Sequence, residues 1–256
     1  MLRYLGLILI SCLFWSCSNN SEPDDPQSSQ PSIMLLGASI AHSSNGWFEM
    51  GCASLNMRGI NKAKNAEAIF DSARRMYRGT AYTFREFENT ELLVIMHVHN
   101  EDVFCRDEIL PNLDDYKITY EYEDYAGAFD YVIRKYKSDC ESLEFNPASK
   151  YYNVQGGKPA KIMLCTFWHD SREKYNQSVR RLAEYWDIPL IEFDTNIGFS
   201  KNDEGLSDPG EPSRAVAINF EKINGVEYGW HPLKGFDEPI QQKMAEIFVD
   251  AVCSNL

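Results

Sequence analysis

A serine near the amino end and five histidines spread along the chain are the side chains best suited to chemistry. Ser39 stands in the turn Gly37-Ala38-Ser39-Ile40, directly after the apolar run 32–36. The glycine permits a sharp turn, and the small residue after it lets a substrate approach the backbone. A serine hydroxyl becomes a good nucleophile only when an adjacent base accepts its proton. The turn therefore favours nucleophilic catalysis if a histidine lies nearby.

The histidines follow a common pattern along the chain. They are His42 after the first apolar run, His97 and His99 at the end of the third, His169 after the fourth, and His231 before the last amphipathic stretch. In open α/β sheets, ligands bind at the carboxyl ends of the strands, where the loops converge. All five histidines fall on that side of the predicted sheet, which indicates a site there without fixing its chemistry.

The apolar pattern predicts the elements that would position these side chains. Short apolar runs alternate with longer amphipathic stretches, as in βα units around a parallel sheet. Strands are predicted at 32–36, 56–63, 92–96, 161–166 and 189–193, and helices at 67–77, 125–136, 179–186 and 240–251. The fold class is therefore α/β, with one doubly wound domain around a five-stranded parallel sheet. The stretches 107–124, 146–159 and 198–212 are predicted as polar excursions from this frame.

The first 17 residues are typical of a bacterial lipoprotein signal peptide. A basic residue, Arg3, precedes an apolar run that is too short to cross a bilayer core of roughly 30 Å. Lipobox-like sites end at Cys12 and at Cys17, and we expect lipidation at Cys17 because that site leaves the apolar run its better length. Residues 18–31 predict a disordered tether, and residues 32–256 the domain. The expected location is the outer membrane or the cell surface.

Charge and cysteine usage restrict the partners further. The formal net charge is −13, which would repel phosphate backbones, so nucleic acid is excluded as a partner. Five cysteines remain after the leader, and an odd count leaves at least one free thiol in an exported protein. Cys165 lies in an apolar run and is expected in the core.

Four sequence blocks, taken in order over residues 32–253, resemble those of the SGNH/GDSL hydrolases. The turn at Ser39 resembles the GDS block, with Ala38 where that family usually has Asp. The remaining blocks are Asn61–Ala66, where the family usually has a Gly near the position of Asn65; Val98-His99-Asn100-Glu101, at the place of the GxND block; and Gly229-Trp230-His231-Pro232, which resembles the terminal His-Pro block before a helix with a Met-Ala pair.

The resemblance implies a flavodoxin-like three-layer α/β/α fold and ester hydrolysis without a metal or other cofactor. Ser39 would attack the ester while His231 accepts its proton. The Ser39 N–H, the Asn100 side chain and a backbone N–H near Asn65 would form the oxyanion hole. That family's third catalytic residue is an Asp three positions before the histidine. Tyr228 stands there in this chain, so Glu227 or a backbone carbonyl would have to orient the imidazole.

The substrate is expected to be a small-molecule or glycan ester, with O-acetyl groups on carbohydrates favoured. Predicted substrate contacts are Trp47, His99 and His169. Trp47 could stack on a sugar ring or could instead be a hydrophobic lid over the first helix. His169 could contact substrate or be a loop residue.

Two other functions are compatible with the sequence. The chain could be a non-catalytic carbohydrate-binding surface lipoprotein on the same fold. It could also be a metal-dependent hydrolase in which zinc is held by histidines and carboxylates at the strand ends. The candidate ligands are His97, His99 and His169 with Glu101, Asp102 or Asp170, although the strand pattern favours a core position for His97.

Overall fold

The computed structural model describes residues 30–98, 125–200, 211–223 and 225–255. The predicted leader, the lipidation site Cys17 and most of the tether lie outside these residues. So do His99, Asn100, Glu101 and Asp102. None of the described helices is both long and apolar enough to cross a bilayer.

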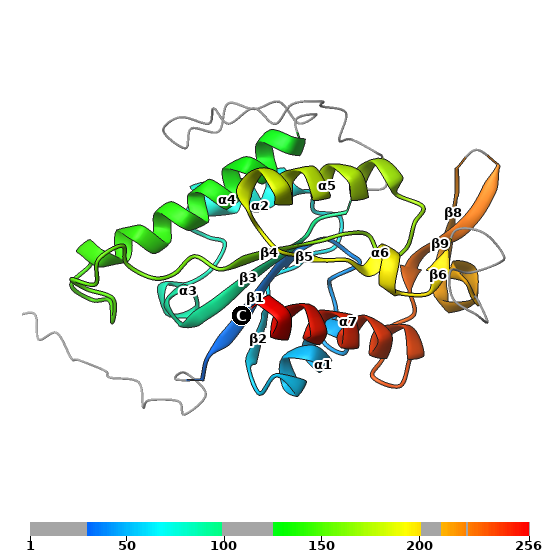
Figure 1. Cartoon of the computed structure of the whole chain (residues 1–256), viewed down its shortest axis with the longest axis horizontal. Coiled ribbons are helices and arrows are strands. Elements are labelled where there is room, and N and C mark those ends of the chain that lie inside the picture. Colours follow the sequence, from blue (N-terminus) through cyan, green and yellow to red (C-terminus); the bar gives the residue numbers. More distant parts are fainter. Residues whose placement is uncertain (1–29, 99–124, 201–210, 224, 256) are drawn as a thin grey trace, which may run out of the picture.

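A five-stranded parallel sheet forms the centre of the domain, in the strand order β2-β1-β3-β4-β5 (Figure 1). The strands are β1 Ser32–Gly37, β2 Arg58–Asn61, β3 Thr90–Met96, β4 Ile162–Cys165 and β5 Leu190–Ile191. Every residue of β1 and β4 is buried, because helices cover both faces of the sheet. Burial on both faces explains why the sequences of these strands are continuous apolar runs. The predicted fold class is confirmed.

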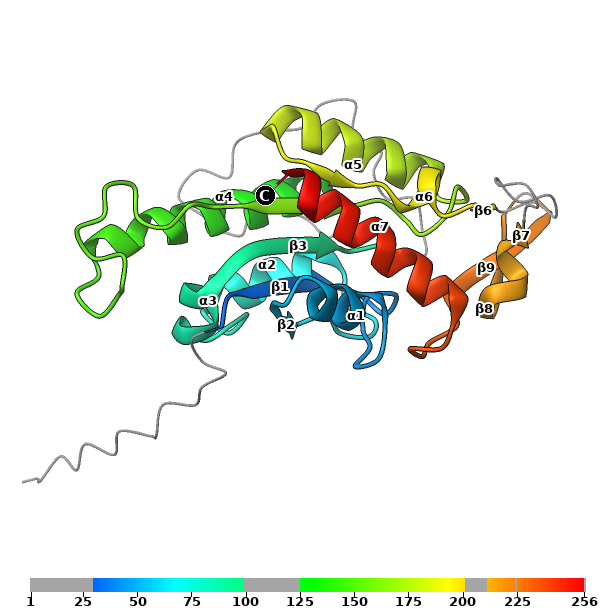
Figure 2. The same cartoon turned by 60° about the horizontal axis from the view of Figure 1, so that its bottom comes forward.

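Helices lie on both faces of the sheet and make the domain three layers thick (Figure 2). One face carries α2 Ile69–Tyr77, α4 Tyr125–Ser142 and α5 Glu173–Trp186, and the other carries α1 Trp47–Ser54 and α7 Pro239–Asn255. The short helices α3 Phe84–Asn89 and α6 Phe193–Asn196, with the 3₁₀ turns Leu143–Phe145 and Ser213–Val216, complete the described helical structure. The four predicted helices correspond to α2, α4, α5 and α7.

An antiparallel hairpin that the sequence reading did not predict extends beyond the carboxyl edge of the sheet (Figure 1). It consists of β8 Ala217–Ile223 and β9 Val226–Pro232. The signal for it is the pair Asn224-Gly225 between two strand-like runs, which is typical of a two-residue hairpin turn. Gly225 has a φ of +84°, as such a turn requires. The two-residue strands β6 Phe199–Ser200 and β7 Glu211–Pro212 pair at the ends of the predicted polar stretch 198–212.

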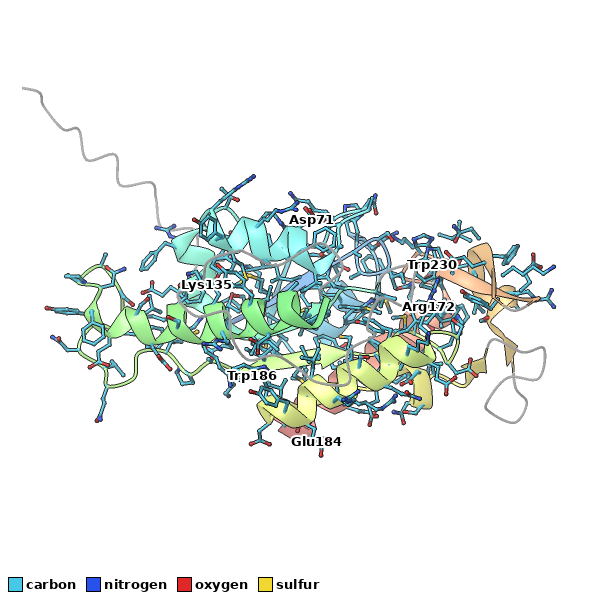
Figure 3. The ribbon with its side chains drawn as sticks, turned by 90° about the horizontal axis from the view of Figure 1, so that it is seen from above. Asp71, Lys135, Arg172, Glu184, Trp186 and Trp230 are labelled. Atoms are coloured by element: carbon cyan, nitrogen blue, oxygen red, sulfur yellow. The ribbon has the colours of Figure 1, made fainter. Side chains whose placement is uncertain are left out.

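A buried arginine attaches this hairpin to the sheet domain. Arg172 forms an ion pair with Glu221 of β8 and lies over the Trp230 ring of β9, 4.5 Å from its centroid. Figure 3 shows Arg172 and Trp230 beside each other. The Tyr228 hydroxyl also donates to Glu221, at 3.0 Å. A charge that is buried is tolerated only when it is paired in this way, so this cluster determines where the hairpin lies.

His169 belongs to the same cluster, and the prediction that it contacts substrate is wrong. Its side chain is fully buried, and Nε2 donates to the Gly229 carbonyl of β9 at 2.8 Å. Nδ1 accepts from the Ser171 N–H at 3.3 Å. Both ring nitrogens are therefore used within the protein, and His169 connects the loop after β4 to the hairpin.

Trp47 is a core residue, so the prediction that it contacts substrate is also wrong. Only 1% of its surface is exposed. Its ring meets those of Phe48, Phe193 and Phe248 edge-on, with centroids 5.1 to 5.8 Å apart. These rings come from α1, α6 and α7, and they join the helices on this side of the sheet.

The four cysteines in the described part of the chain are free thiols. Cys52, Cys140 and Cys165 are buried, and Cys253 is exposed. Cys165 thus lies in the core, as predicted. Cys105 lies outside the described residues.

The packing of Trp47 predicts a stability effect. Trp47→Ala should lower the free energy of unfolding by about 3–5 kcal/mol, because it removes a fully buried ring. Trp47→Phe should cost less, since no described residue accepts from the buried Trp47 Nε1. Denaturant unfolding measures both changes, with Phe220→Ala as a control because Phe220 is half exposed. The core assignment fails if Trp47→Ala and Phe220→Ala have equal stability.

Candidate active site

The structure brings Ser39 and His231 into hydrogen-bond contact across 192 residues of sequence. Ser39 Oγ lies 2.8 Å from Nε2 of His231. Ser39 occupies the turn after β1, and His231 lies near the end of β9. A Cβ at Gly37 would lie 2.8 Å from the Met96 carbonyl, so only glycine fits where β1 approaches β3 before this turn.

A residue that the sequence reading missed, Asn219, holds the other side of the imidazole. Its Oδ1 lies 2.9 Å from Nδ1 of His231 and also accepts the backbone N–H of His231 at 3.0 Å. A backbone N–H can only donate, so the atom that faces it must be the amide oxygen and not the nitrogen. Nδ1 must then carry the ring proton. Nε2 is left with a lone pair directed at the Ser39 hydroxyl.

The hairpin register puts Asn219 in this position. Asn219 of β8 is the cross-strand partner of His231 of β9. Side chains of such partners lie next to each other. The register shifts on both sides of Asn219, leaving Ile218 and Trp230 without cross-strand partners. Bulges of this kind re-aim side chains and are frequent beside active sites.

The prediction that Glu227 orients His231 is wrong. The two residues are four positions apart on one strand, which corresponds to about 13 Å. Glu227 is exposed, lies opposite Lys222 and forms an ion pair of 3.6 Å with Arg214. The alternative of a backbone carbonyl also does not apply, because the Asn219 side chain occupies that position.

A lysine sets the electrostatic environment of the pair. Lys234 Nζ donates to the Ser39 carbonyl at 3.1 Å and to the His42 carbonyl, so it ties the segment after β9 to the serine turn. Burial of the imidazole, together with the charge of Lys234, lowers the pKa of His231 below its usual 6.5. His231 is therefore neutral at neutral pH, which is the state a general base requires.

A pocket of about 520 Å³ opens beside this pair. Its lining residues are Ala38, Ser39, Asn65, Ala66, Glu67, Val98, Trp230 and His231. No described residue accepts from the backbone N–H of Ser39, Asn65 or Ala66. Because these residues line the pocket, their N–H groups are the candidates for binding an oxyanion.

Ala66 lines the pocket next to Asn65. Its φ is +60°, a left-handed conformation that costs an L-residue about 1–2 kcal/mol and favours glycine. The resemblance implied a glycine near the position of Asn65, and Ala66 has the backbone conformation that favours one. Val98 lines the same pocket, whereas the predicted contributions of Asn100 and His99 lie outside the described residues.

The zinc alternative has no ligand set among the described residues. The Nε2 atom of His97 lies 2.7 Å from Ser72 Oγ, and that of His169 bonds to a backbone carbonyl. His97 is a buried core histidine, and burial with the charge of Arg75 lowers its pKa to about 3. The remaining candidate ligands apart from Asp170 are not described.

Several solved structures are similar to the chain at low sequence identity. A protein assigned to the lipolytic G-D-S-L family from Desulfitobacterium hafniense DCB-2 is 11% identical, with 86% of this chain and 98% of that chain covered and a TM-score of 0.48. A member of the same family from Veillonella parvula DSM 2008 is 17% identical, with 88% and 99% covered and a TM-score of 0.45. The catalytic domain of Streptococcus pneumoniae peptidoglycan O-acetyltransferase A is 13% identical, with 88% and 94% covered and a TM-score of 0.43.

The first two are described as members of the lipolytic G-D-S-L family, and with TM-scores below 0.5 none of the three carries an argument about the function of this chain. No curated protein matches the chain significantly. One family model matches residues 30–256 and is described as a domain of unknown function, DUF5040. The chain belongs to this DUF5040 family.

Proposed function

We propose that this protein is a serine hydrolase that cleaves an ester through Ser39, His231 and Asn219. One observation carries the proposal. Ser39 Oγ donates to His231 Nε2, and His231 donates from Nδ1 and its backbone N–H to Asn219 Oδ1, so the hydrogen bonds form a continuous chain that ends at a pocket. The hydroxyl, the base and the group that orients the base thus stand in the order that nucleophilic catalysis by serine requires.

The reaction follows from this geometry. His231 Nε2 takes the proton of Ser39 as Oγ attacks the ester carbonyl carbon. The negative oxygen that forms is stabilised by the N–H of Ser39 and by an N–H of the Asn65-Ala66 segment. His231 returns the proton to the leaving alkoxide, and the C–O bond of the ester breaks. Water activated by His231 then releases the acid from Ser39.

Asn219 orients the imidazole but adds no charge to it. An amide fills this place in some catalytic triads. The imidazolium formed during the reaction is therefore not paired with a carboxylate in the described part of the site. Because the pKa of His231 is also lowered, the base is a weak one.

The substrate and the location are further parts of the proposal. The leader-like sequence and the polar segment after it support an exported, membrane-tethered protein. A tethered hydrolase with a modest pocket suits esters of short acids on surface polymers. O-acetyl groups on polysaccharides are the substrates to test first.

A panel of esters tests the proposed activity directly. We expect purified residues 18–256 to hydrolyse short-chain aryl esters or O-acetylated polysaccharides, and a fluorophosphonate to label Ser39, as located by peptide mass spectrometry. A protein that binds glycans but hydrolyses no ester, and that is not labelled at Ser39, would instead be a carbohydrate-binding protein on this fold.

Removing either member of the pair should abolish turnover. Ser39→Ala and His231→Ala should each lower kcat by about 10⁴-fold or more, and the double variant should lose little beyond either single one. Members of one catalytic unit are not additive, because the second has no function without the first. His42→Ala, with its exposed side chain, is the control. Additive losses would show that the two residues act separately.

Asn219 and Glu227 provide a matched comparison on the hairpin. Asn219→Ala should lower kcat by about 10²–10⁴-fold, since the imidazole loses the acceptor that fixes its tautomer. Glu227→Gln should change kcat less than about twofold, because its carboxylate pairs with Arg214. Steady-state kinetics of both variants measure this. A large loss in Glu227→Gln alone would restore Glu227 as the orienting residue.

The pH profile tests the electrostatics. His231 must be neutral to act, so activity falls as the pH drops through its pKa. We expect the acid limb of kcat/KM to lie below pH 6.5, because the pKa is lowered. Lys234→Met removes one of the two causes and should move that limb to higher pH, whereas the exposed Lys243→Met should not. An acid limb that stays in place in Lys234→Met would contradict this account.

A further inference from the structure

The loop between β2 and α2 forms one wall of the pocket. Asn65, Ala66 and Glu67 line it, and no described residue accepts a hydrogen bond from the N–H groups of Asn65 and Ala66. Ala66 has a left-handed backbone, which a non-glycine residue keeps only where its surroundings hold it. The contacts that hold the loop therefore determine where these N–H groups point.

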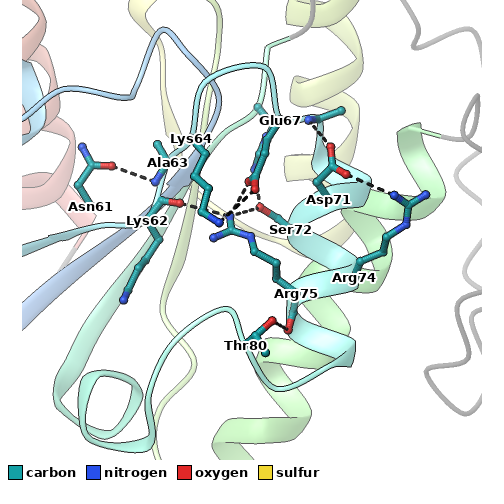
Figure 4. Close-up of polar contacts among 12 residues, drawn as sticks. Asn61, Lys62, Ala63, Lys64, Glu67, Asp71, Ser72, Arg74, Arg75 and Thr80 are labelled. Carbon is teal, nitrogen blue, oxygen red and sulfur yellow. Dashed lines mark hydrogen bonds and ion pairs between the residues drawn. The ribbon is translucent and has the colours of Figure 1, made fainter.

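The first half of the loop is bonded to β1 and to itself. The N–H groups of Lys62 and Lys64 donate to carbonyls of β1 at 2.8 and 3.0 Å. Asn61 Oδ1 accepts the Ala63 N–H at 3.0 Å (Figure 4). Beyond Lys64, the loop's own contacts are weaker: the Glu67 N–H donates to the Lys64 carbonyl at 3.4 Å, and Lys64 Nζ lies 3.6 Å from Glu67 Oε1 with its side chain 57% exposed.

The second half is held from α2 by Arg75. Its Nη2 lies 2.7 Å from Glu67 Oε2, 3.2 Å from the Lys62 carbonyl and 3.1 Å from Ser72 Oγ (Figure 4). The side chains of Arg75 and Glu67 are only 13% and 17% exposed. Hydrogen bonds between ionised partners are short and strong, and here little water competes with them. One guanidinium thus contacts both ends of the segment 62–67.

Ser72 connects this arrangement to the core. Its Oγ lies 2.7 Å from His97 Nε2. Because His97 is neutral, Nε2 can accept the Ser72 proton, and the Ser72 lone pairs are left to accept from Arg75. The network therefore runs from Glu67 on the pocket wall to His97. The residue after His97, Val98, lines the same pocket.

We propose that Arg75 is a positioning residue for the oxyanion site. It holds Glu67 and the left-handed Ala66 so that a backbone N–H of this loop faces the oxygen that becomes negative at Ser39. The inference rests on the proposed hydrolase function. Arg75 has no hydrogen bond or ion pair with Ser39 or His231 among the described contacts, so it acts through the loop.

Two measurements on Arg75→Met test this, with Arg74→Met as the matched control. Arg74 lies next to Arg75 on α2 but pairs with Asp71 of the same helix, at 3.4 Å. We expect hydrogen–deuterium exchange of the amides of residues 62–67 to become faster in Arg75→Met and to stay unchanged in Arg74→Met. Glu67→Gln should give an intermediate change, because it removes the charge but keeps an oxygen.

Kinetics supply the second readout. Arg75→Met should lower kcat by about 10–10²-fold, with little change in KM. This decrease should not exceed the one that follows removal of an oxyanion donor itself. The acid limb of the pH profile should stay in place, because His231 is not involved. A general loss of structure would instead speed exchange throughout the domain and lower the midpoint of thermal unfolding.

The outcomes separate this inference from the proposed function. Unchanged loop exchange in Arg75→Met overturns the inference, whether or not the protein is an enzyme. Faster loop exchange with unchanged kcat also overturns it. If the wild-type protein hydrolyses no ester and Ser39 is not labelled, the hydrolase proposal fails, and with it the catalytic part of this inference.

Discussion

The candidate site depends on one oxygen atom that accepts two hydrogen bonds from the same residue. Asn219 Oδ1 faces both the backbone N–H and the ring Nδ1 of His231. The backbone donor determines which end of the amide faces the histidine, and the amide oxygen in turn determines the tautomer of the ring. The tautomer leaves Nε2 unprotonated, 2.8 Å from Ser39 Oγ. Without this acceptor, the imidazole could rotate or carry its proton on the wrong nitrogen.

The register of the β8–β9 hairpin and its contacts with the sheet domain determine where that oxygen lies. Asn219 and His231 sit opposite each other only because the hairpin has its present register and bulges. The hairpin stands at the carboxyl edge of the sheet because Arg172 pairs with Glu221 and packs on Trp230, and because His169 donates to Gly229. A buried ion pair of this kind is costly to break, since it would leave one charge unpartnered. Lys234 then joins the segment after the hairpin to the serine turn.

Much of the fold could be predicted from the sequence, because a parallel sheet covered on both faces needs continuous apolar strands. The runs at β1, β3 and β4 carried that information directly. Ser39 and His231 could be predicted as a pair because the order of the blocks around them resembles that of the SGNH/GDSL hydrolases, which implies these roles. The left-handed backbone of Ala66 could not be predicted, because such a conformation at alanine leaves no compositional trace.

The wrong predictions concern contacts between segments far apart in sequence. Asn219 could not be predicted as the residue that orients His231, because the pairing of the two depends on the hairpin register. Glu227 was predicted for this role because it lies near His231 along the chain. The pair Asn224-Gly225 would have indicated the hairpin, although not the bulges that set its register. Trp47 and His169 have residue types common in binding sites, but Phe193, Phe248 and Gly229 bury them, and no local pattern shows those neighbours.

The protonation of the His231 ring tests the central claim most directly. Nitrogen-15 NMR of ring-labelled histidine, with His231 assigned by comparison with His231→Gln, distinguishes a protonated from an unprotonated ring nitrogen. At neutral pH we predict a proton on Nδ1 and none on Nε2, and loss of this single tautomer in Asn219→Ala. A proton on Nε2 in the wild-type protein, or the same spectrum in Asn219→Ala, would contradict the account.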